Sequence, residues 1–416
     1  MPETGLTKGS IVYVCFLILG LGTLLPWNFF ITAESYWQYK FRNPDPGNTT
    51  IPIGKTELQN LYTPMQVCFS QIPNFIFLFI NALYSDKIPQ RIRMVVSLTL
   101  MIIFFTITTA LTKVNTDSWQ TGFFALTIII IFIMNSSGAI FQGGLFGIAG
   151  MFPSKYMTAV VSGQALGGVF ASGARIVSLA AGADDVTSAF IYFMIAVGVM
   201  LLTMASYLYM TSTDFFKHYT NCQTEDVNEK KAEQNEAGFV AEQIRVFKQI
   251  WPLALSCMGV FFVTLAVFPV ICVRIQSTYE NEAWRDTYFQ PVVTFLLFNI
   301  GDYLGRQVAG LIAWPGKESR LIPLFVVLRV VFIPLFLMCN NNLEAVPDYF
   351  EDDGFYIAIM LLFSISNGYL SSLCMMFGPR LVEEKDAEKA GSLMAAFLGL
   401  GLLMGGVSSF AVATIK

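Results

Sequence analysis

The chain has 416 residues, of which 55% are hydrophobic and only 13% are charged, and its formal net charge is −4. Soluble domains carry about 25% charged residues, so a chain this poor in charge could not cover a water-exposed surface of its size. The 7 cysteines show no disulfide or zinc spacing, no basic stripe suggests nucleic acid, and the only histidine, His218, lies in a polar segment. We therefore predict an all-α integral membrane protein with no catalytic residues, metal, cofactor or nucleic-acid partner.

Apolar runs of about 20 residues, each long enough to cross a bilayer once, recur along the chain. The first run, from Ile11, is longer than the apolar region of a signal peptide and contains Pro26, Trp27 and Asn28, so it is predicted to stay as a helix. The pattern predicts eleven transmembrane helices, at 11–33, 60–83, 93–112, 121–150, 157–181, 187–210, 250–273, 286–313, 320–339, 354–378 and 387–413.

One long polar segment interrupts this pattern between the sixth and seventh predicted helices. Its run from Thr224 to Glu236 is highly charged and lacks aromatic residues, which favours a flexible segment. We therefore expect an N-terminal six-helix half at 1–212, a cytoplasmic linker at 213–248 and a C-terminal five-helix half at 249–416.

The distribution of basic residues predicts the orientation. Loops on the same side of the membrane as the N-terminus hold about twice as many Lys and Arg residues as loops on the other side. This bias predicts a cytoplasmic N-terminus and, for an odd number of crossings, a C-terminus outside. The sequon at Asn48 then falls in the first outer loop, which makes Asn48 a candidate glycosylation site.

The eighth predicted helix carries charge inside an apolar stretch. Asp302 and Arg306 stand four residues apart, and Phe295 and Asn299 fall on the same helix face. A charge at the bilayer centre costs about 3 kcal/mol or more, so such groups face a bundle interior or a water-filled cavity. The pair is either a structural ion pair between helices or part of a recognition stripe along a path through the membrane. The amide and the aromatic ring on the same face favour the second interpretation.

Two further arginines fall within predicted helices. Arg175 lies close enough to the outer end of the fifth helix to reach toward Asp184 and Asp185. Arg329 lies in the middle of the ninth helix and is expected to be buried in a structural contact.

Four motifs together are distinctive: GLGTLLPWNFF from Gly20, NSSGAIFQGGLFG from Asn135, FNIGDYLGR from Phe298, and SNGYL from Ser366. On these motifs the chain resembles the equilibrative nucleoside transporter family, in its animal plasma-membrane type, from about residue 11 to residue 413. The resemblance implies a fold similar to the major facilitator class, with a 6+5 arrangement of helices around a central cavity.

The resemblance also implies substrate-binding residues. It assigns Asp302 and Arg306 to the ribose hydroxyls and Gln142 to the edge of the base. A carboxylate can accept from two neighbouring hydroxyls, a guanidinium can donate to ribose oxygens, and an amide can do both, so these residue types suit those roles. Positions that line the cavity in the family match Leu24, Trp27, Phe268, Asn299 and Leu402. Further candidate lining residues are Ile31, Gln71, Asn74 and Phe295.

The function that the resemblance implies is facilitated diffusion of purine and pyrimidine nucleosides, such as adenosine and uridine, by alternating access of a monomeric uniporter. The alternative is proton-coupled transport of nucleosides or nucleobases on the same scaffold. Asp302 is the only clear intramembrane acid, which weakens both proton coupling and an intramembrane protease with paired aspartates. Gln71 and Asn74 stand where well-known relatives are apolar, and would admit nucleobases if they face the cavity. Only ten residues precede the first predicted helix, which favours the plasma membrane over lysosomes or other endomembranes.

Overall fold

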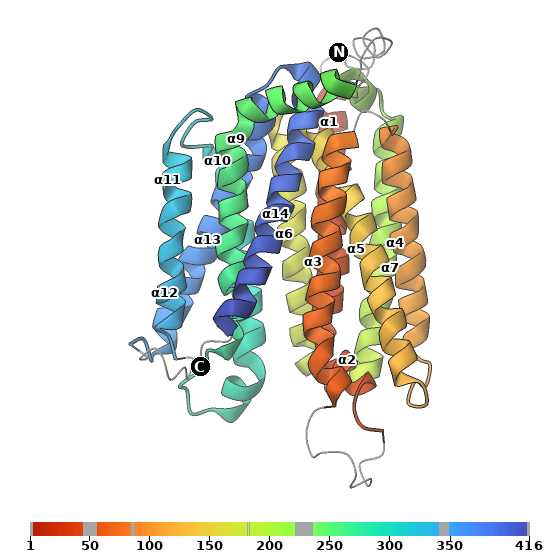
Figure 1. The fold of residues 1–416 in the computed structure, drawn as a ribbon, viewed down its shortest axis with the longest axis vertical. Helices are drawn as coiled ribbons and strands as arrows, with labels where there is room; N and C mark the ends of the chain where they lie inside the picture. Colours follow the sequence, from red (N-terminus) through yellow and green to blue (C-terminus); the bar gives the residue numbers. More distant parts are fainter. Residues whose placement is uncertain are drawn as a thin grey trace.

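The protein is described here by a computed structural model, which covers residues 3–44, 56–84, 88–180, 182, 184–220, 236–340 and 349–413. These residues fold into a bundle of long, roughly parallel helices (Figure 1). Within the described ranges the one β contact is an isolated bridge between Cys339 and Phe350. The helices of the first part are α1 (Glu3–Thr32), α2 (Glu34–Lys40), α3 (Glu57–Tyr84), α4 (Gln90–Thr112), α5 (Gln120–Met151), α6 (Ser154–Ala180) and α7 (Asp185–Ser212). Those of the second part are α9 (Glu236–Val267), α10 (Leu297–Ile312), α11 (Leu321–Leu328), α12 (Phe332–Leu337), α13 (Asp353–Phe377) and α14 (Ala387–Ala413).

The all-helical prediction is confirmed for the residues that the structure describes. Nine helical stretches there are long and apolar enough to cross a membrane. The apolar run Leu321–Leu337 is shorter and divides into α11 and α12. The segment before α10 consists of π-helical turns, Ala283–Tyr288 and Gln290–Leu296, rather than a regular α-helix.

Two local predictions were wrong at the edges of helices. α9 begins at Glu236, well before the predicted start at residue 250, because charged residues can extend an apolar helix into water. The part of the charged run that precedes Glu236 lies outside the described residues. The segment after Ala33 is not a loop but the short helix α2. Apolar-run length predicted where the long apolar helices lie, but not their polar extensions.

Helices that are distant in sequence pack as close pairs. α1 lies along α6, α9 along α14, and α10 along α13 (Figure 1). At the α1–α6 crossing, a Cβ at Gly20 would overlap the carbonyl oxygen of Val160, and a Cβ at Gly163 would overlap that of Leu17. These two glycines therefore permit the close approach of α1 and α6.

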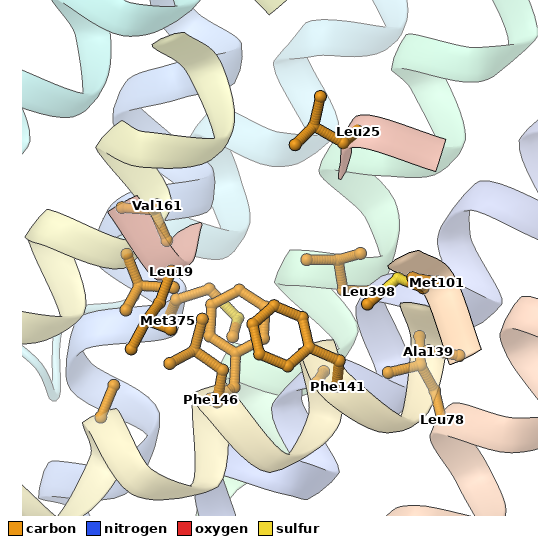
Figure 2. Close-up of a cluster of buried hydrophobic side chains, with 14 of the residues drawn as sticks. Leu19, Leu25, Leu78, Met101, Ala139, Phe141, Phe146, Val161, Met375 and Leu398 are labelled. Atoms are coloured by element: carbon orange, nitrogen blue, oxygen red, sulfur yellow. The ribbon is translucent and has the colours of Figure 1, made fainter. Parts of the chain in front are cut away.

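Apolar side chains from several helices fill the interior. Phe141 and Phe146 of α5 lie between Leu19 of α1, Val161 of α6 and Met375 of α13 (Figure 2). These side chains are almost fully buried. The cluster joins helices from both ends of the sequence, and two smaller clusters of buried side chains lie within the second part of the chain.

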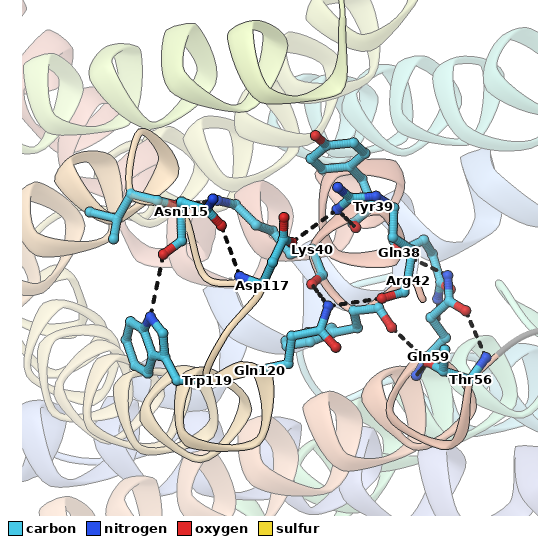
Figure 3. A network of polar contacts seen from close by, with 12 residues as sticks. Gln38, Tyr39, Lys40, Arg42, Thr56, Gln59, Asn115, Asp117, Trp119 and Gln120 are labelled. Atoms are coloured by element: carbon cyan, nitrogen blue, oxygen red, sulfur yellow. Dashed lines mark hydrogen bonds and ion pairs between the residues drawn. The ribbon is translucent and has the colours of Figure 1, made fainter. Parts of the chain in front are cut away.

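Polar contacts fix the end of the bundle where α2 lies. Lys40 at the end of α2 donates from Nζ to the carbonyl oxygen of Val114 at 2.6 Å, and Gln120 donates from Nε2 to the carbonyl oxygens of Lys40 and Arg42 (Figure 3). Arg42 also forms an ion pair with Asp117 at 3.5 Å. These contacts hold α2 against the turn between α4 and α5.

Ion pairs connect the early and late helices at the opposite end. Arg93 of α4 donates to Asn81 of α3 at 2.7 Å and to Glu388 of α14 at 2.9 Å. Arg380, just after α13, donates to the carbonyl oxygen of Phe152 between α5 and α6 at 3.1 Å. Contacts between residues far apart in sequence therefore join the early and late helices at this end of the bundle.

Candidate functional site

A cavity of about 180 Å³ lies between the early and late helices. Its walls come from α1, α3, α5, α6, α9, α10, α13, α14 and the turns before α10. One water occupies roughly 30 Å³ in the liquid, so the space is suited to an organic molecule rather than to a single structural water. Its lining mixes apolar rings with amides and one ion pair.

Every candidate residue named from the sequence in the membrane region lies on the wall of this cavity. The set comprises Leu24, Trp27, Ile31, Gln71, Asn74, Gln142, Phe268, Phe295, Asn299, Asp302, Arg306 and Leu402. These residues, which the sequence places far apart, come from six helical segments and the turn after α9 and lie on one common surface. The glycosylation candidate Asn48 lies outside the described residues.

The predicted ion pair on α10 is confirmed. Arg306 donates from Nε to Oδ2 of Asp302 at 2.8 Å, and each side chain is only 5% exposed. Two acceptors on α6 also receive hydrogen bonds from Nη1 of Arg306: the carbonyl oxygen of Val161 at 2.7 Å and Oε1 of Gln164 at 3.5 Å. The guanidinium thus contacts both α10 and α6 at the cavity wall, where buried charge is tolerated only because it is paired.

The remaining face of Asp302 is held from α13. Asn367 donates from Nδ2 to Oδ1 of Asp302 at 2.6 Å. Each carboxylate oxygen therefore has one protein donor and keeps further lone-pair capacity, because an ionised carboxylate can accept about four hydrogen bonds. The carboxylate is positioned to accept from a hydroxyl of a bound molecule.

Aromatic rings form an apolar wall next to this polar pair. Phe268 stacks on Phe298 with ring centroids 4.2 Å apart, and Phe295 meets Phe268 edge-on at 5.6 Å. Trp27 and Leu24 line the cavity from α1. Flat apolar surfaces of this kind favour a planar ring in the ligand.

Amide side chains line the part of the cavity formed by α3 and α5. Gln142 of α5 is 3% exposed and Gln71 of α3 is 7% exposed. Oε1 of Gln71 has no hydrogen-bond partner in the described structure. Because a buried polar atom without a partner is costly, this oxygen is suited to accept a donor from a ligand.

Several polar residues of the cavity had no role assigned from the sequence, among them Gln164, Thr264 and Asn367. Asn367 occurs in the SNGYL motif, whereas Gln164 of α6 and Thr264 of α9 belong to none of the four quoted motifs. Their importance depends on contacts between helices: Gln164 reaches Thr23 on α1 at 3.0 Å, and Thr264 reaches Asn367 on α13 at 2.7 Å. A polar residue in an apolar segment was the only sequence signal that could have identified them.

The predicted partners of Arg175 were wrong. Its Nη1 donates to Oγ of Ser35 on α2 at 3.1 Å. Asp184 instead accepts from the backbone N–H of Thr187 and caps α7, and its hydrogen bonds with Thr187 lower the pKa of this carboxyl group. The expectation that Arg329 is buried is confirmed, since it is 2% exposed.

No metal-binding cluster of three or more His, Cys, Asp or Glu side chains occurs in the portion of the chain that the structure describes. The site offers a fixed carboxylate, a guanidinium, amides and aromatic walls. This set can bind a neutral molecule that combines a planar ring with neighbouring hydroxyl groups.

Comparisons with known proteins give a consistent result. The sequence profile described as nucleoside transporter matches residues 128–414. Equilibrative nucleoside transporter 1 of Homo sapiens is 37% identical over 439 residues, and the alignment covers 96% of each chain. Equilibrative nucleoside transporter 2 of Homo sapiens is 37% identical over 445 residues, with 96% of each chain covered.

Solved structures with a similar fold belong to the major facilitator superfamily. The proton:xylose symporter XylE is similar with a TM-score of 0.64 at 12% identity, covering 97% of this chain and 89% of that one. The human organic anion transporter MFSD10 has a TM-score of 0.63 at 11% identity, covering 97% and 94%. At such low identity these two likenesses support the fold alone.

Proposed function

Because the chain belongs to the equilibrative nucleoside transporter family, we propose that it carries purine and pyrimidine nucleosides across the membrane by facilitated diffusion. It is a transporter rather than an enzyme. The observation that supports this function most directly is the Asp302–Arg306 pair, which lies at a cavity wall beside aromatic rings. A nucleoside combines the vicinal hydroxyls that suit the pair with the planar base that suits the rings.

In this proposal Asp302 and Arg306 bind the ribose hydroxyls, and Gln142 binds the edge of the base. Leu24, Trp27 and Phe268 form the apolar walls. Further lining comes from Asn299 and Leu402, with Ile31, Gln71, Asn74 and Phe295. Asn299 also donates from Nδ2 to Oγ of Ser172 on α6 at 3.0 Å, which helps to hold α10 beside α6.

Alternating access requires two halves that rock around the site. We propose six membrane crossings in 1–212 and five in 249–416, joined by the segment 213–248, with the N-terminus in the cytoplasm and the C-terminus outside. The start of α1 and the end of α14 lie at opposite ends of the bundle, as an odd number of crossings requires (Figure 1). The contacts of Arg93 and Arg380 would then close the cytoplasmic end.

Plasma-membrane placement of this multi-pass protein fits its similarity to transporters 1 and 2 of the family. We further propose that it acts as a monomer and that Asn48 carries a glycan. The polar groups of Gln71 and Asn74 on the cavity wall support nucleobases as additional substrates.

The test of this function is uptake of radiolabelled adenosine and uridine into proteoliposomes that contain the purified chain. Saturable uptake that stops at equal concentrations inside and outside, with or without a proton gradient, is the expected result. Accumulation above equilibrium that needs the gradient would instead establish the proton-coupled alternative, which family membership does not favour. No uptake of either nucleoside would contradict the proposal.

The role of Gln142 leads to a selective prediction. We expect Gln142→Ala to raise the KM for adenosine by about three- to tenfold, because one or two neutral hydrogen bonds contribute about 0.5–1.5 kcal/mol each. Benzimidazole riboside is the matched control substrate, because its base lacks the amino group of adenine while its ribose is unchanged. Competition assays should show that the variant binds this compound nearly as well as the wild type does. An equal loss for both compounds would assign Gln142 to packing.

A further inference from the structure

Arg329 is a buried cation with few partners. It lies between α11 and α12, is 2% exposed, and its guanidinium carbon lies 4.9 Å from the centre of the Phe363 ring. Nη2 donates to Oγ1 of Thr264 at 2.9 Å, whereas Nε and Nη1 have no hydrogen-bond partner in the described structure. A residue needed only to fill this space would be apolar, because burying a poorly paired charge in a membrane protein is costly.

The hydrogen bond that Arg329 donates to Thr264 begins a chain of hydrogen bonds, here called the relay, that runs through Asn367 to Asp302 at the candidate site. Oγ1 of Thr264 on α9 lies 2.7 Å from Oδ1 of Asn367 on α13. Nδ2 of Asn367 lies 2.6 Å from Oδ1 of Asp302 on α10. All four residues are at most 4% exposed. Water therefore competes weakly with the relay, and its hydrogen bonds are stronger than they would be at a surface.

The charges at the two ends fix the direction of every link. A guanidinium can only donate and an ionised carboxylate can only accept. Thr264 therefore accepts from Arg329. Its single hydroxyl proton can go to Oδ1 of Asn367 at 2.7 Å or to the carbonyl oxygen of Val260 at 2.8 Å, and the relay uses the first of these. Asn367 presents its NH₂ group to Asp302 and its carbonyl oxygen to Thr264. A flipped Asn367 amide would place its carbonyl oxygen against the carboxylate. The carboxylate thus selects the amide orientation of Asn367, and Arg329, by donating to Thr264, strengthens the hydrogen bond from Thr264 to the amide oxygen.

The relay complements the direct ion pair. Arg306 donates to Oδ2 of Asp302, whereas the relay from Arg329 ends at Oδ1. Each carboxylate oxygen is therefore held by a hydrogen-bond path that starts at a cation. The path from Arg329 uses only residues that follow the linker, whereas Arg306 also contacts α6.

We infer that Arg329 is a positioning residue for substrate recognition: through Thr264 and Asn367 it fixes the orientation of the Asp302 carboxylate that accepts the ribose hydroxyls. The expected effect of Arg329 on transport rests on the proposed function. The effect of the relay on Oδ1 of the carboxylate does not depend on the proposed function. The effect on transport and the effect on the carboxylate are therefore tested by separate measurements.

The transport readout is the preference for uridine over 3′-deoxyuridine, measured as the ratio of their kcat/KM values. We expect Arg329→Met and Thr264→Val each to reduce this preference by about five- to tenfold, the range expected for weakening one charge-assisted hydrogen bond. Arg329→Lys keeps a charged donor and should remain within about threefold of the wild type. The double variant should lose no more than either single variant, because both changes interrupt one path.

The structural readout is the infrared carboxylate stretch of Asp302 in the substrate-free protein, assigned by comparison with Asp302→Asn. Arg329→Met and Thr264→Val should shift this band in the same direction. Arg175→Met is the matched control, because Arg175 lies in a membrane helix and donates to Ser35 rather than to the relay. It should change neither the band nor the substrate preference.

An unshifted band together with an unchanged uridine preference in Arg329→Met would overturn the inference and leave the proposed function intact. If Arg329→Met fails to fold, the same two results in Thr264→Val would overturn it. A wild type that transports no nucleoside would contradict the proposed function, while a shifted band in the variants would still support the relay.

Discussion

Arg306→Ala is expected to reduce saturable adenosine uptake by about 100-fold or more while the protein still reaches the membrane. The substitution removes the donor to Asp302 and the donor to the carbonyl oxygen of Val161. Removing one partner of a buried ion pair costs about 3–5 kcal/mol, and each 1.4 kcal/mol corresponds to about tenfold in affinity. The measurement is initial uptake per molecule of surface-labelled protein in cells that lack other nucleoside transport.

Two variants separate recognition from general loss of charge. Arg306→Lys keeps the positive charge but not the planar fork, so it should recover only a small part of the uptake. Arg175→Ala removes another arginine of the membrane region, whose contact is Ser35, and should transport normally. Normal adenosine uptake by well-expressed Arg306→Ala would overturn the assignment of the site.

The long apolar helices were predictable because a bilayer requires both length and apolar composition. Departures occurred where this requirement does not apply. α2 is a short helix of only seven residues, Glu34–Lys40, and α9 extends beyond the apolar core to Glu236. The error in the partner of Arg175 has the same origin, because Ser35 lies on α2, which was expected to be a loop.

The candidate site was predictable to the extent that charge and amides in apolar segments are unusual. Asp302 and Arg306 share one helix, so their spacing alone predicted their contact. The supporting contacts from Thr264, Asn367 and Gln164 depend on which helices become neighbours, and no local pattern contains that information. The motif resemblance located the wall of the cavity, whereas the structure was needed to identify what holds the Asp302–Arg306 pair in place.

Gly368→Ala is expected to destabilise the protein by about 2 kcal/mol or more and to abolish nucleoside binding. On helix propensity alone the change would stabilise by about 1 kcal/mol. A Cβ at Gly368, however, would overlap the backbone carbonyl oxygen of Asp302 on α10. The two helices are equally close at Gly305 of α10, where a Cβ would overlap the carbonyl oxygen of Ile365 on α13. Forcing atoms into a packed contact costs about 1–3 kcal/mol or more, and backbone cannot move aside as a flexible side chain can.

Thermal unfolding in detergent and adenosine binding together test this expectation, with Gly198→Ala on α7 as the matched control. A Cβ at Gly198 would meet no atom within 4 Å, so that variant should be as stable as the wild type or more stable. Gly368→Ala differs because α10 must move away from α13, which carries Asp302 away from Asn367. Unchanged stability and binding in Gly368→Ala would mean that the α10–α13 distance does not set the position of the carboxylate. The close helix crossing is therefore part of the recognition site, because it brings the amide of one helix to the acid of the other.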